Sequence, residues 1–391
     1  VEYNSVMQAG QNKLRVLSIG TDATIFESGA PSRTRLQAYA QCLDELHVIS
    51  YTSYSSQFQA EHISPNIWFY PASSHLFSLQ PFHAFRIGKR IIGERKINII
   101  SVQDPAESGL AGWLLKLKTG LSLHIQVHAD FFSPYFRRNS WKERLRYWLA
   151  LFLIPRGDAF RVVSPRIKHS LESRFMIHGS RIAVLPIFVD RERIASAEPA
   201  FNLHQKYPQF DFIILVVSRL FREKNISLAI EAFCELLKEF PKTGLVIVGN
   251  GPEHKKLKVK SEKLKIAVSV HFEGWQEDLV SYYKTADLYL LTSNFEGYGR
   301  TVIEAAAAGL PINKTDVGVA VEIIREGENG RVIGVGDKAS FVKALIEVRR
   351  NYAAKQKMAE QARRKVIEAE PRTFEAYLGE YRKSYEDILR N

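Results

Sequence analysis

The stretch ADLYLLTSNFEGYGRTVIEAAAAGLPI, residues 286–312, holds an apolar strand, a glycine-rich turn and a helix in succession. The strand is expected at 286–293 and the helix at 301–309, where a glycine and then Pro311 end it. A buried strand that runs through a tight turn into a helix is the repeating unit of a parallel, doubly wound sheet. The stretch therefore indicates an α/β protein.

Two carboxylates flank the Gly-x-Gly turn of this stretch. Glu296 lies in the turn, whereas Glu304 lies inside a helix made otherwise of Val, Ile and Ala. A buried carboxylate is destabilising by several kcal/mol unless a partner satisfies it. Vicinal sugar hydroxyls are one such partner. The alternative is that Glu296 favours the helix dipole and that Glu304 pairs with a nearby Arg.

The same alternation of strands and helices runs through both halves of the chain. In the first half we expect strands at 14–20, 47–52, 97–104, 122–130, 160–164 and 181–190, and helices at 35–46, 83–96 and 109–120. After the polar stretch 191–211, we expect strands at 212–220, 244–251, 268–275 and 286–293, and helices at 227–240 and 301–309. This pattern predicts two Rossmann-like domains that face each other across a cleft, the usual place for a ligand.

The predicted domain boundaries follow from the polar stretch. The N-terminal, acceptor-side domain is expected at 13–195 and the C-terminal, nucleotide-sugar-binding domain at 205–371. A last helical segment, 372–391, is expected to pack back on the first domain.

Composition restricts the class of protein. The chain has 391 residues, 46% of them hydrophobic, and a formal net charge of +12, which favours an anionic partner. Its two cysteines have no metal-type spacing and fit a reducing cytosol. The stretch 1–15 lacks the apolar segment of a signal peptide, and the apolar run 147–155 is too short to span a bilayer. We therefore expect a cytoplasmic protein.

Three further segments carry candidate chemistry. The basic turn SRLFREKN, 218–225, follows the first strand of the second domain and suits a diphosphate, although a solvated charged loop is the alternative. The turn VIVGNGPE, 246–253, offers Gly249 and Gly251 for close backbone approach, which strand-to-helix turns also use structurally. His128 lies at the end of the strand 122–130 of the first domain, at the edge where such sheets bind ligands.

Taken together, these segments resemble the retaining glycosyltransferases of family 4, which have the GT-B fold. The resemblance rests on Ser218-Arg219-Leu220 with Glu223-Lys224, the Gly-x-Gly-Pro turn at 249–252, Phe272-Glu273-Gly274, and Glu296-x7-Glu304 followed by Ala-x-Gly-x-Pro. It covers nearly the whole chain and is strongest from 212 to 330.

The resemblance implies a role for each matching residue. Arg219 and Lys224 would hold the donor's diphosphate and stabilise it as the leaving group, so that no metal or other cofactor is needed. Glu296 would contact hydroxyls of the donor sugar, Glu304 would contact the ribose, and His128 would lie near the reacting sugar. The other donor-binding residues would be Gly249, Gly251, Phe272, Glu273, Gly297, Tyr298, Gly299, Arg300 and Thr301. The reaction implied is transfer of a hexose-type sugar, with retention, from a UDP- or GDP-sugar.

The chain departs from the family pattern in three places. Family members often begin with a double-Gly loop, whereas 21–35 here has the single Gly29. Acceptor-side candidates in the first domain are Gly29, Arg33, Arg35 and Asp130. After the Ala-x-Gly-x-Pro segment, Gly318 is kept, but Val319 stands where a second Gly is common. Asn225 replaces a common Gly after Lys224.

The acceptor side of the first domain is basic and aromatic. Between 135 and 182, the basic residues Arg137, Arg138, Lys142, Arg144, Arg146, Arg156, Arg161, Arg166, Lys168, Arg174 and Arg181 are interleaved with Tyr135, Phe136, Trp141, Tyr147, Trp148 and Phe152. Such a stretch is typical of a membrane-surface contact, although a solvated helix face is the alternative. The segment HADFFSPYFRR, 128–138, resembles the corresponding segment of family members that act in bacterial surface-polysaccharide synthesis. We therefore expect a glycan or polyprenyl-linked acceptor and peripheral association with the inner face of the membrane.

Other functions stay open at this point. They are a glycosyltransferase with a soluble acceptor, a GT-B sugar-nucleotide epimerase or phosphorylase, and a non-enzymatic two-domain binding protein. The Glu-x7-Glu pattern with the Arg/Lys pair disfavours the epimerase and the phosphorylase. Only net charge suggests a nucleic-acid partner, and no recognised motif supports one.

Overall fold

The structure is a computed structural model that describes residues 13–318, 322–369 and 373–390. The residues of the described chain form two compact units. Unit 1 comprises residues up to Phe131, Trp141–Pro186 and the C-terminal segment from Glu375. Unit 2 comprises Phe132–Ser140 and Ile187–Phe374. Val319, Pro371 and the N-terminal residues 1–12, on which some of the expectations above fall, lie outside the described residues.

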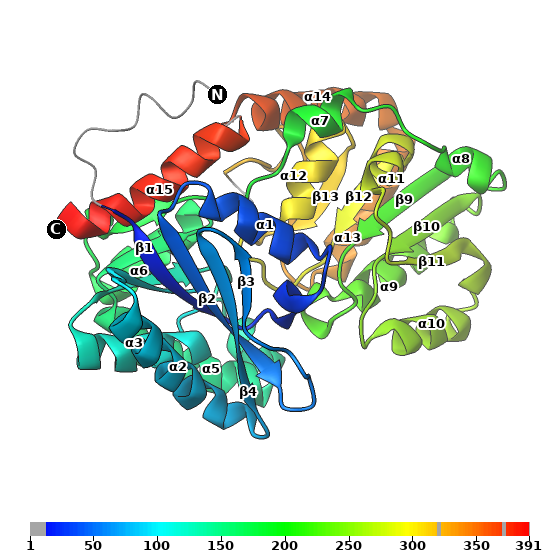
Figure 1. Cartoon of the computed structure of the whole chain (residues 1–391). Helices are drawn as coiled ribbons and strands as arrows, with labels where there is room; N and C mark the ends of the chain where they lie inside the picture. Colours follow the sequence, from blue (N-terminus) through cyan, green and yellow to red (C-terminus); the bar gives the residue numbers. More distant parts are fainter. Residues whose placement is uncertain (1–12, 319–321, 370–372, 391) are drawn as a thin grey trace. The chain divides into compact units, whose positions relative to one another are not determined.

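Unit 1 is built on a sheet in the order β3-β4-β2-β1-β5-β6-β7-β8. Figure 1 labels the strands β1 to β4 of this sheet. Its strands are β1 (Arg15–Gly20), β2 (Glu45–Ser53), β3 (Glu61–Ser64), β4 (Ile67–Ser74), β5 (Ile99–Val102), β6 (Ser122–Val127), β7 (Ala159–Val162) and β8 (Ile182–Val184). All neighbours are parallel except β3, which runs antiparallel to β4. The chain changes direction across the sheet between β1 and β5, so the loops after these strands diverge there.

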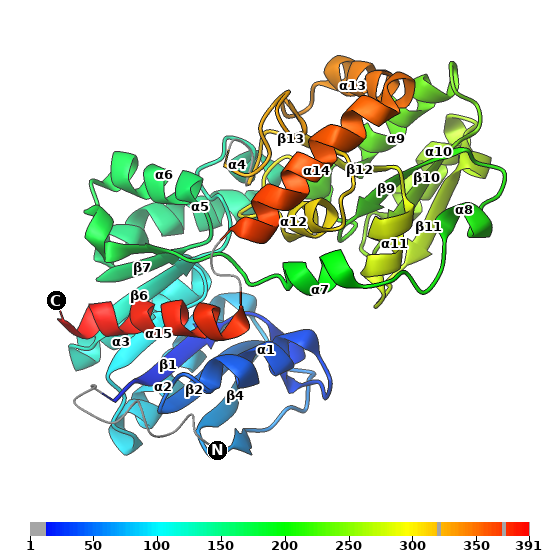
Figure 2. The same ribbon diagram turned by 90° about the horizontal axis from the view of Figure 1, so that it is seen from above.

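Helices cover both faces of this sheet. They are α1 (Pro31–Ala40), α2 (Gln80–Glu94), α3 (Glu107–Thr119), α5 (Trp141–Leu153), α6 (Pro165–Phe175) and the C-terminal α15 (Phe374–Arg390). Figure 2 shows α15 beside α1, and the hydroxyls of Tyr39 and Tyr377 lie 3.1 Å apart between them. Helix α3 packs against both α2 and α5.

Unit 2 has a six-stranded parallel sheet in the order β11-β10-β9-β12-β13-β14. Its strands are β9 (Phe212–Val217), β10 (Thr243–Val248), β11 (Val270–Gly274), β12 (Leu288–Leu291), β13 (Ile312–Thr315) and β14 (Arg331–Ile333). Its helices are α4 (Phe136–Asn139), α7 (Arg191–Ser196), α8 (Leu203–Lys206), α9 (Ile226–Leu237), α10 (His254–Lys263), α11 (Leu279–Thr285), α12 (Arg300–Ala307), α13 (Lys338–Arg350) and α14 (Tyr352–Glu368).

The core of unit 2 follows from strand alternation. Ile213 and Leu215 of β9 belong to one apolar cluster with α12 and α14, whereas Phe212 and Ile214 belong to a second cluster with α9 and α13. Successive side chains of a strand point to opposite faces, so a strand buried on both faces must be apolar throughout. The reversal of strand order lies between β9 and β12, and the loops after these two strands meet there.

The predicted fold class, two doubly wound parallel sheets, is confirmed, with corrections in both units. In unit 2, the strands β13 and β14 were not predicted. The antiparallel edge strand β3 and the strand β4 were not predicted. Pro71 lies within β4, and a proline in the sequence argues against a strand because it removes a ladder donor. The ladder with β3 ends before Pro71, so the missing N–H falls where only β2 adjoins β4. The helix predicted at 35–46 is α1, which ends at Ala40, and β2 begins at Glu45.

Candidate active site

Two loops of unit 2 meet at the reversal of its sheet. The turn 218–225 follows β9, and the loop 292–299 follows β12. The amide of Asn294 donates to the carbonyl of Glu223 at 2.7 Å, and the hydroxyl of Thr292 donates to the carbonyl of Lys224 at 3.1 Å. These bonds fix the two loops against each other, so their side chains are presented at one edge of the sheet.

Lys224 and Glu296 form an ion pair between these loops. The ammonium nitrogen of Lys224 lies 2.5 Å from a carboxylate oxygen of Glu296, and each side chain is only 14% exposed. The hydroxyl of Ser293 donates to the same oxygen at 2.8 Å. The second carboxylate oxygen and the other ammonium protons remain for further hydrogen bonds, because an ammonium carries three donors. A cation and an anion are thus held side by side at the sheet edge.

The other basic side chains of the turn are exposed. Arg219 stacks over the ring of Phe221, 5.1 Å from its centroid, and Arg222 donates to the carbonyl of Asn139 at 2.9 Å. Asn225 has a φ of 45°, in the left-handed region that favours glycine and tolerates asparagine. The departure from the family pattern at Asn225 therefore preserves the backbone conformation of the turn.

Glu304 has protein partners within unit 2. It is 7% exposed, one carboxylate oxygen accepts from Arg300 at 3.0 Å, and the other accepts from the hydroxyl of Tyr283 at 2.9 Å. Burial, and then the charge of Glu304, raise the pKa of Tyr283 well above its ordinary value, so the phenol stays protonated and donates. The alternative interpretation, a pairing with a nearby Arg, is present in the structure. Ribose binding by Glu304 stays a prediction.

The glycines of the unit 2 loops allow backbone to pack on backbone. Gly249 has a φ of 127°, and a Cβ there would collide with the carbonyl of Ser218; a Cβ on Gly251 would collide with Leu220. These two glycines therefore let the turn 218–220 lie against the end of β10. A Cβ on Gly318 would collide with the carbonyl of Tyr298, so Gly318 supports the glycine-rich loop.

The remaining predicted donor residues lie around these loops. Gly297, Tyr298 and Gly299 form the turn before α12, with Gly299 at a φ of 95°. Thr301 accepts a hydrogen bond at 2.6 Å from the hydroxyl of Tyr289. Phe272 lies in the middle of β11, with its ring centroid 5.1 Å from that of His254.

Glu273 is directed into unit 2 by its own partners. Its carboxylate accepts from the hydroxyl of Tyr282 at 2.6 Å, and it also contacts Lys206 and Tyr207. Burial acts to raise the pKa of Glu273, but the hydrogen bonds from these three groups outweigh it and lower the pKa. These three contacts fix the position of the Glu273 carboxylate within unit 2.

In unit 1, the predicted residues lie near the carboxyl ends of β1 and β6. His128 and Asp130 follow β6, and the ring nitrogen Nε2 of His128 lies 3.1 Å from the side-chain oxygen of Gln126. Arg33 pairs with Glu61 at 2.9 Å and donates to the carbonyl of Ile25, so its guanidinium braces the loop after β1.

The other two acceptor-side candidates lie in the same region of unit 1. Arg35 is half-buried on α1, and Gly29 has a φ of 80° with open space around it. The charge of Arg35 contributes to lowering the pKa of His128, which places it in the electrostatic environment of that ring.

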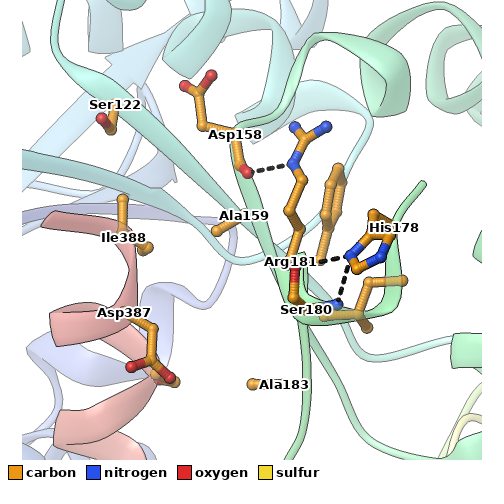
Figure 3. Close-up of a pocket in the computed structure, with 12 residues that line it drawn as sticks. Ser122, Asp158, Ala159, His178, Ser180, Arg181, Ala183, Asp387 and Ile388 are labelled. Carbon is orange, nitrogen blue, oxygen red and sulfur yellow. Dashed lines mark hydrogen bonds between the residues drawn. The ribbon is translucent and has the colours of Figure 1, made fainter. Parts of the chain in front are cut away.

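A cavity of about 630 Å³ lies elsewhere in unit 1 (Figure 3). It is lined by Ser122, Asp158, Ala159, Phe160, His178, Ser180, Arg181, Ile182, Ala183, Ser384, Asp387 and Ile388. Arg181 donates there to the carbonyl of Asp158 at 2.7 Å. Ser122, Ala159 and Ile182 each begin a strand, so the cavity lies at the amino ends of β6, β7 and β8. Open α/β sheets bind ligands at the opposite edge.

Comparison with known proteins identifies the family. The model of the family described as "Glycosyltransferase Family 4" matches residues 35–193, and the model of the family described as "Glycosyl transferases group 1" matches residues 202–365. The chain belongs to the family 4 glycosyltransferases. A solved structure of HepE from Anabaena, in complex with UDP and glucose, superposes with a TM-score of 0.70 at 16% identity, covering 90% of this chain and 95% of that one. The fold is therefore GT-B.

Two curated relatives differ in their acceptors. The N-acetyl-alpha-D-glucosaminyl L-malate synthase of Bacillus anthracis is 24% identical over 363 residues, which is 90% of this chain and 92% of the relative. The UDP-Gal:alpha-D-GlcNAc-diphosphoundecaprenol alpha-1,3-galactosyltransferase of Escherichia coli is 23% identical over 265 residues, 66% of this chain and 68% of the relative. This glycosyltransferase thus resembles proteins that use a small acid and proteins that use a lipid diphosphate.

Sequence reasoning missed two residues around the candidate site and misplaced a third. Ser293, the last residue of the predicted strand 286–293, holds Glu296, and Gln126 lies in strand β6 of unit 1. Arg161 was expected in the basic stretch at the membrane surface, but it lies on β7 and is 2% exposed, so that expectation is wrong for Arg161. A charged residue in the otherwise apolar run FRVVS was the available signal, since a buried cation requires polar partners.

Proposed function

We propose that this glycosyltransferase moves a hexose-type sugar, with retention, from a UDP- or GDP-sugar to a glycan or lipid-linked acceptor in the synthesis of cell-surface polysaccharide or glycolipid. The observation that carries the proposal is the ion pair of Lys224 and Glu296 at the sheet reversal of unit 2, with Arg219 in the same turn as Lys224. The two charges lie 2.5 Å apart, which supports a site where a cation binds a diphosphate and an anion binds sugar hydroxyls.

In the proposed reaction, the bond between the anomeric carbon and the diphosphate oxygen breaks, and its electron pair goes to the diphosphate. The acceptor hydroxyl bonds to the same carbon from the same face, and its proton passes to the departing diphosphate. Lys224 and Arg219 stabilise the negative charge that develops on the leaving group, the task that a divalent cation performs in other transferases. Glu296 orients the sugar through its hydroxyls.

The donor base is proposed by analogy and by the residues around it. The HepE structure contains UDP, which supports a uridine nucleotide. We propose that Phe272 and the backbone of Glu273 flank the base and that Glu304 binds the ribose. In the part of the chain that the structure describes, no group of three His, Cys, Asp or Glu side chains is arranged to hold a metal ion. Metal independence remains part of the proposal, resting on Arg219 and Lys224.

A thermal-shift screen with UDP, GDP, ADP and dTDP, each with and without Mg²⁺, tests the donor side. A ligand that binds only the folded state raises the melting temperature by mass action. We expect a selective shift with UDP or GDP that does not depend on Mg²⁺ and that is lost in Lys224→Ala. A shift that requires Mg²⁺ would contradict the proposed role of Lys224 and Arg219.

The lipid-linked acceptor is supported by an exposed stripe on α5. Trp141, Leu145, Trp148 and Phe152 are 69%, 62%, 61% and 43% exposed, and their spacing of four, three and four residues places them on one helix face. Lys142 and Arg144 lie on the same helix. Exposed aromatic residues beside basic ones suit an anionic membrane surface. None of the described helices has the length and hydropathy needed to cross a bilayer. We therefore propose peripheral binding at the inner face of the cell membrane.

Liposome co-sedimentation tests the membrane proposal. We expect binding to vesicles that contain anionic lipid at low salt, and we expect the double variant Trp141→Ser, Trp148→Ser to lose it. Trp275, 65% exposed in unit 2, supplies the matched control: Trp275→Ser should bind as the wild type does. Equal binding of the double variant would contradict the role of α5.

The second candidate is transfer to a soluble acceptor, which the Bacillus anthracis relative favours through its L-malate acceptor. Assays of nucleotide release with detergent-dispersed polyprenyl-diphosphate glycan and with small hydroxy acids separate the two. A sugar-nucleotide epimerase would turn over the donor without an acceptor product, and a binding protein would release no nucleotide.

A further inference from the structure

A connected set of hydrogen bonds inside unit 1 links His128 to the C-terminal helix α15. At its centre is Arg161 of β7, whose guanidinium donates to the side-chain oxygen of Gln126 at 3.0 Å and to the hydroxyl of Tyr377 at 2.6 Å. Its Nε donates to the carbonyl of Leu185 at 3.2 Å. Among the described residues, no carboxylate hydrogen-bonds to this buried cation. Arg161 is therefore a fixed positive charge that is satisfied by neutral groups.

Arg161 determines which way the amide of Gln126 faces. A guanidinium has five donors and no acceptor, so the Gln126 atom that it contacts must be the oxygen. The amide nitrogen then faces the hydroxyls of Ser101, at 3.1 Å, and Tyr385, at 3.3 Å, both of which can accept. The hydrogen-bond pattern thus fixes the amide orientation, which electron density alone seldom distinguishes.

The orientation of Gln126 in turn determines the tautomer of His128. The Nε2 atom of His128 lies 3.1 Å from the Gln126 oxygen, which has a second lone pair to accept with. Two acceptors cannot form a hydrogen bond, so Nε2 must carry the proton and Nδ1 must carry a lone pair. Within the described residues, this Nδ1 is buried and has no hydrogen-bond partner.

The surroundings also hold His128 neutral. Burial, then the charges of Arg161 on β7 and Arg35 on α1, and then His124 on β6, lower the pKa of His128 to about 3. A neutral imidazole keeps one acceptor nitrogen, whereas an imidazolium has none.

We propose that Gln126, held by Arg161, is a positioning residue that fixes His128 as the neutral Nε2–H tautomer, so that Nδ1 accepts a hydrogen bond from a hydroxyl of the sugar substrate. The identity of that hydroxyl bearer rests on the proposed function, whereas the tautomer depends on unit 1 alone. The buried and unpartnered acceptor atom supports a ligand donor, because an unsatisfied buried nitrogen is destabilising.

Long-range ¹H–¹⁵N correlation spectra of the full chain with ¹⁵N-histidine test the tautomer, with His128→Gln identifying the resonances. We expect a single Nε2–H tautomer that does not titrate between pH 5 and 8. A protonated Nδ1, or an imidazolium near neutral pH, would overturn the inference. The spectra report the tautomer without any enzymatic activity. A transferase assay that contradicts the proposed function would therefore not contradict the tautomer, and the two failures can be distinguished.

Variants of Gln126 test the positioning role. In Gln126→Leu we expect both tautomers and a kcat about 10-fold lower, the loss of one oriented hydrogen bond, with a smaller change in the donor KM. In Gln126→Glu, which keeps an acceptor oxygen, we expect the tautomer to persist and the pKa of His128 to rise, so that the pH profile of kcat gains an acidic limb.

Gln80 is the matched control. It is also a buried glutamine of unit 1, 6% exposed, and it donates to the carbonyl of Thr52 at 2.9 Å. Gln80→Leu should leave the His128 tautomer and kcat as in the wild type. Wild-type tautomer and kcat in Gln126→Leu would overturn the proposal. If Gln126→Leu does not fold, the proposal is still tested by the tautomer of His128 in the wild type and by the pH profile of kcat in Gln126→Glu.

Discussion

Lys224 and Arg300 of unit 2 and Arg161 of unit 1 are balanced in opposite ways. In unit 2, Lys224 and Arg300 each pair with a carboxylate, at 2.5 and 3.0 Å. In unit 1, the buried Arg161 contacts an amide, a phenol and backbone carbonyls. A paired cation at a sheet edge can exchange its carboxylate for the charge of a ligand. A buried cation without a counter-charge acts through its field on fixed neighbours such as His128.

The largest expected effect comes from breaking the pair of Lys224 and Glu296. Lys224→Ala or Glu296→Ala should lower kcat by about 100-fold or more, the loss typical of one group that stabilises developing charge. Far-UV circular dichroism should be unchanged. Lys238→Ala, which removes an exposed pair with Glu235, should keep wild-type turnover. Turnover near wild type in either site variant would show that this pair is structural only.

The pair of Glu304 and Arg300 tests whether Glu304 binds a ligand or only pairs within the protein. If Glu304 binds the ribose, Glu304→Ala should weaken UDP binding by about 10- to 100-fold, because hydrogen bonds to charged groups contribute about 1.5–3 kcal/mol. Isothermal titration calorimetry measures the affinity. Glu360→Ala removes a similar pair, with Arg363, on the exposed side of α14, and this variant should bind UDP normally. Unchanged UDP affinity in Glu304→Ala would mean that Glu304 only pairs with Arg300 and Tyr283 and does not bind the ribose.

The contacts among the unit 2 candidates could be predicted from the sequence better than the unit 1 network could, and chain separation explains the difference. Glu304 and Arg300 are four residues apart on one helix, so their pairing follows from helical spacing. The pairing of Glu296 with Lys224 spans 72 residues. It could be anticipated only as a shared site, because both lie in loops at the carboxyl edge of one sheet.

The unit 1 network could not be assembled from sequence. Arg161 and Tyr377 are 216 residues apart, and each of Ser101, Gln126 and Arg161 lies on a different strand. The strand pattern predicts that these residues are buried, but it does not predict which polar groups meet across the sheet face. The path of α15 over β6 and β7 decides that, and only the structure supplies it.

Two tyrosines of α15 test whether the charge of Arg161 strengthens its hydrogen bond in unit 1. Tyr377 accepts from the charged Arg161, whereas the hydroxyl of Tyr381 lies 3.0 Å from that of Tyr385, a neutral pair. Tyr377→Phe should therefore lower the free energy of opening of α15 by about 1.5–3 kcal/mol, and Tyr381→Phe by about 1 kcal/mol. Hydrogen exchange of the α15 amides measures both. Equal losses would mean that the charge of Arg161 does not strengthen its bond to Tyr377.

A smaller effect than that of Tyr377→Phe is expected in the pH dependence of stability, and it arises from His124. This ring is fully buried on β6, its Nδ1 lies 3.2 Å from the hydroxyl of Ser101, and its edge contacts Tyr385. Burial, and then the charge of Arg161, lower the pKa of His124 to about 3. Below its ordinary pKa of about 6.5 the unfolded chain binds a proton that the folded chain rejects.

The sign of this dependence follows directly. The contribution of His124 is complete above pH 6.5 and is lost as the pH falls toward 3, by about 1.4 kcal/mol on reaching pH 5.5. His128, which has the same shift, adds to the slope. Denaturant unfolding at pH 7.5 and 5.5 should show a smaller difference in His124→Gln than in wild type, whereas the exposed His83→Gln should keep the wild-type difference. A wild-type difference in His124→Gln would mean that Arg161 and burial do not keep this ring neutral, and the contrast between paired and unpaired cations would then rest on geometry alone.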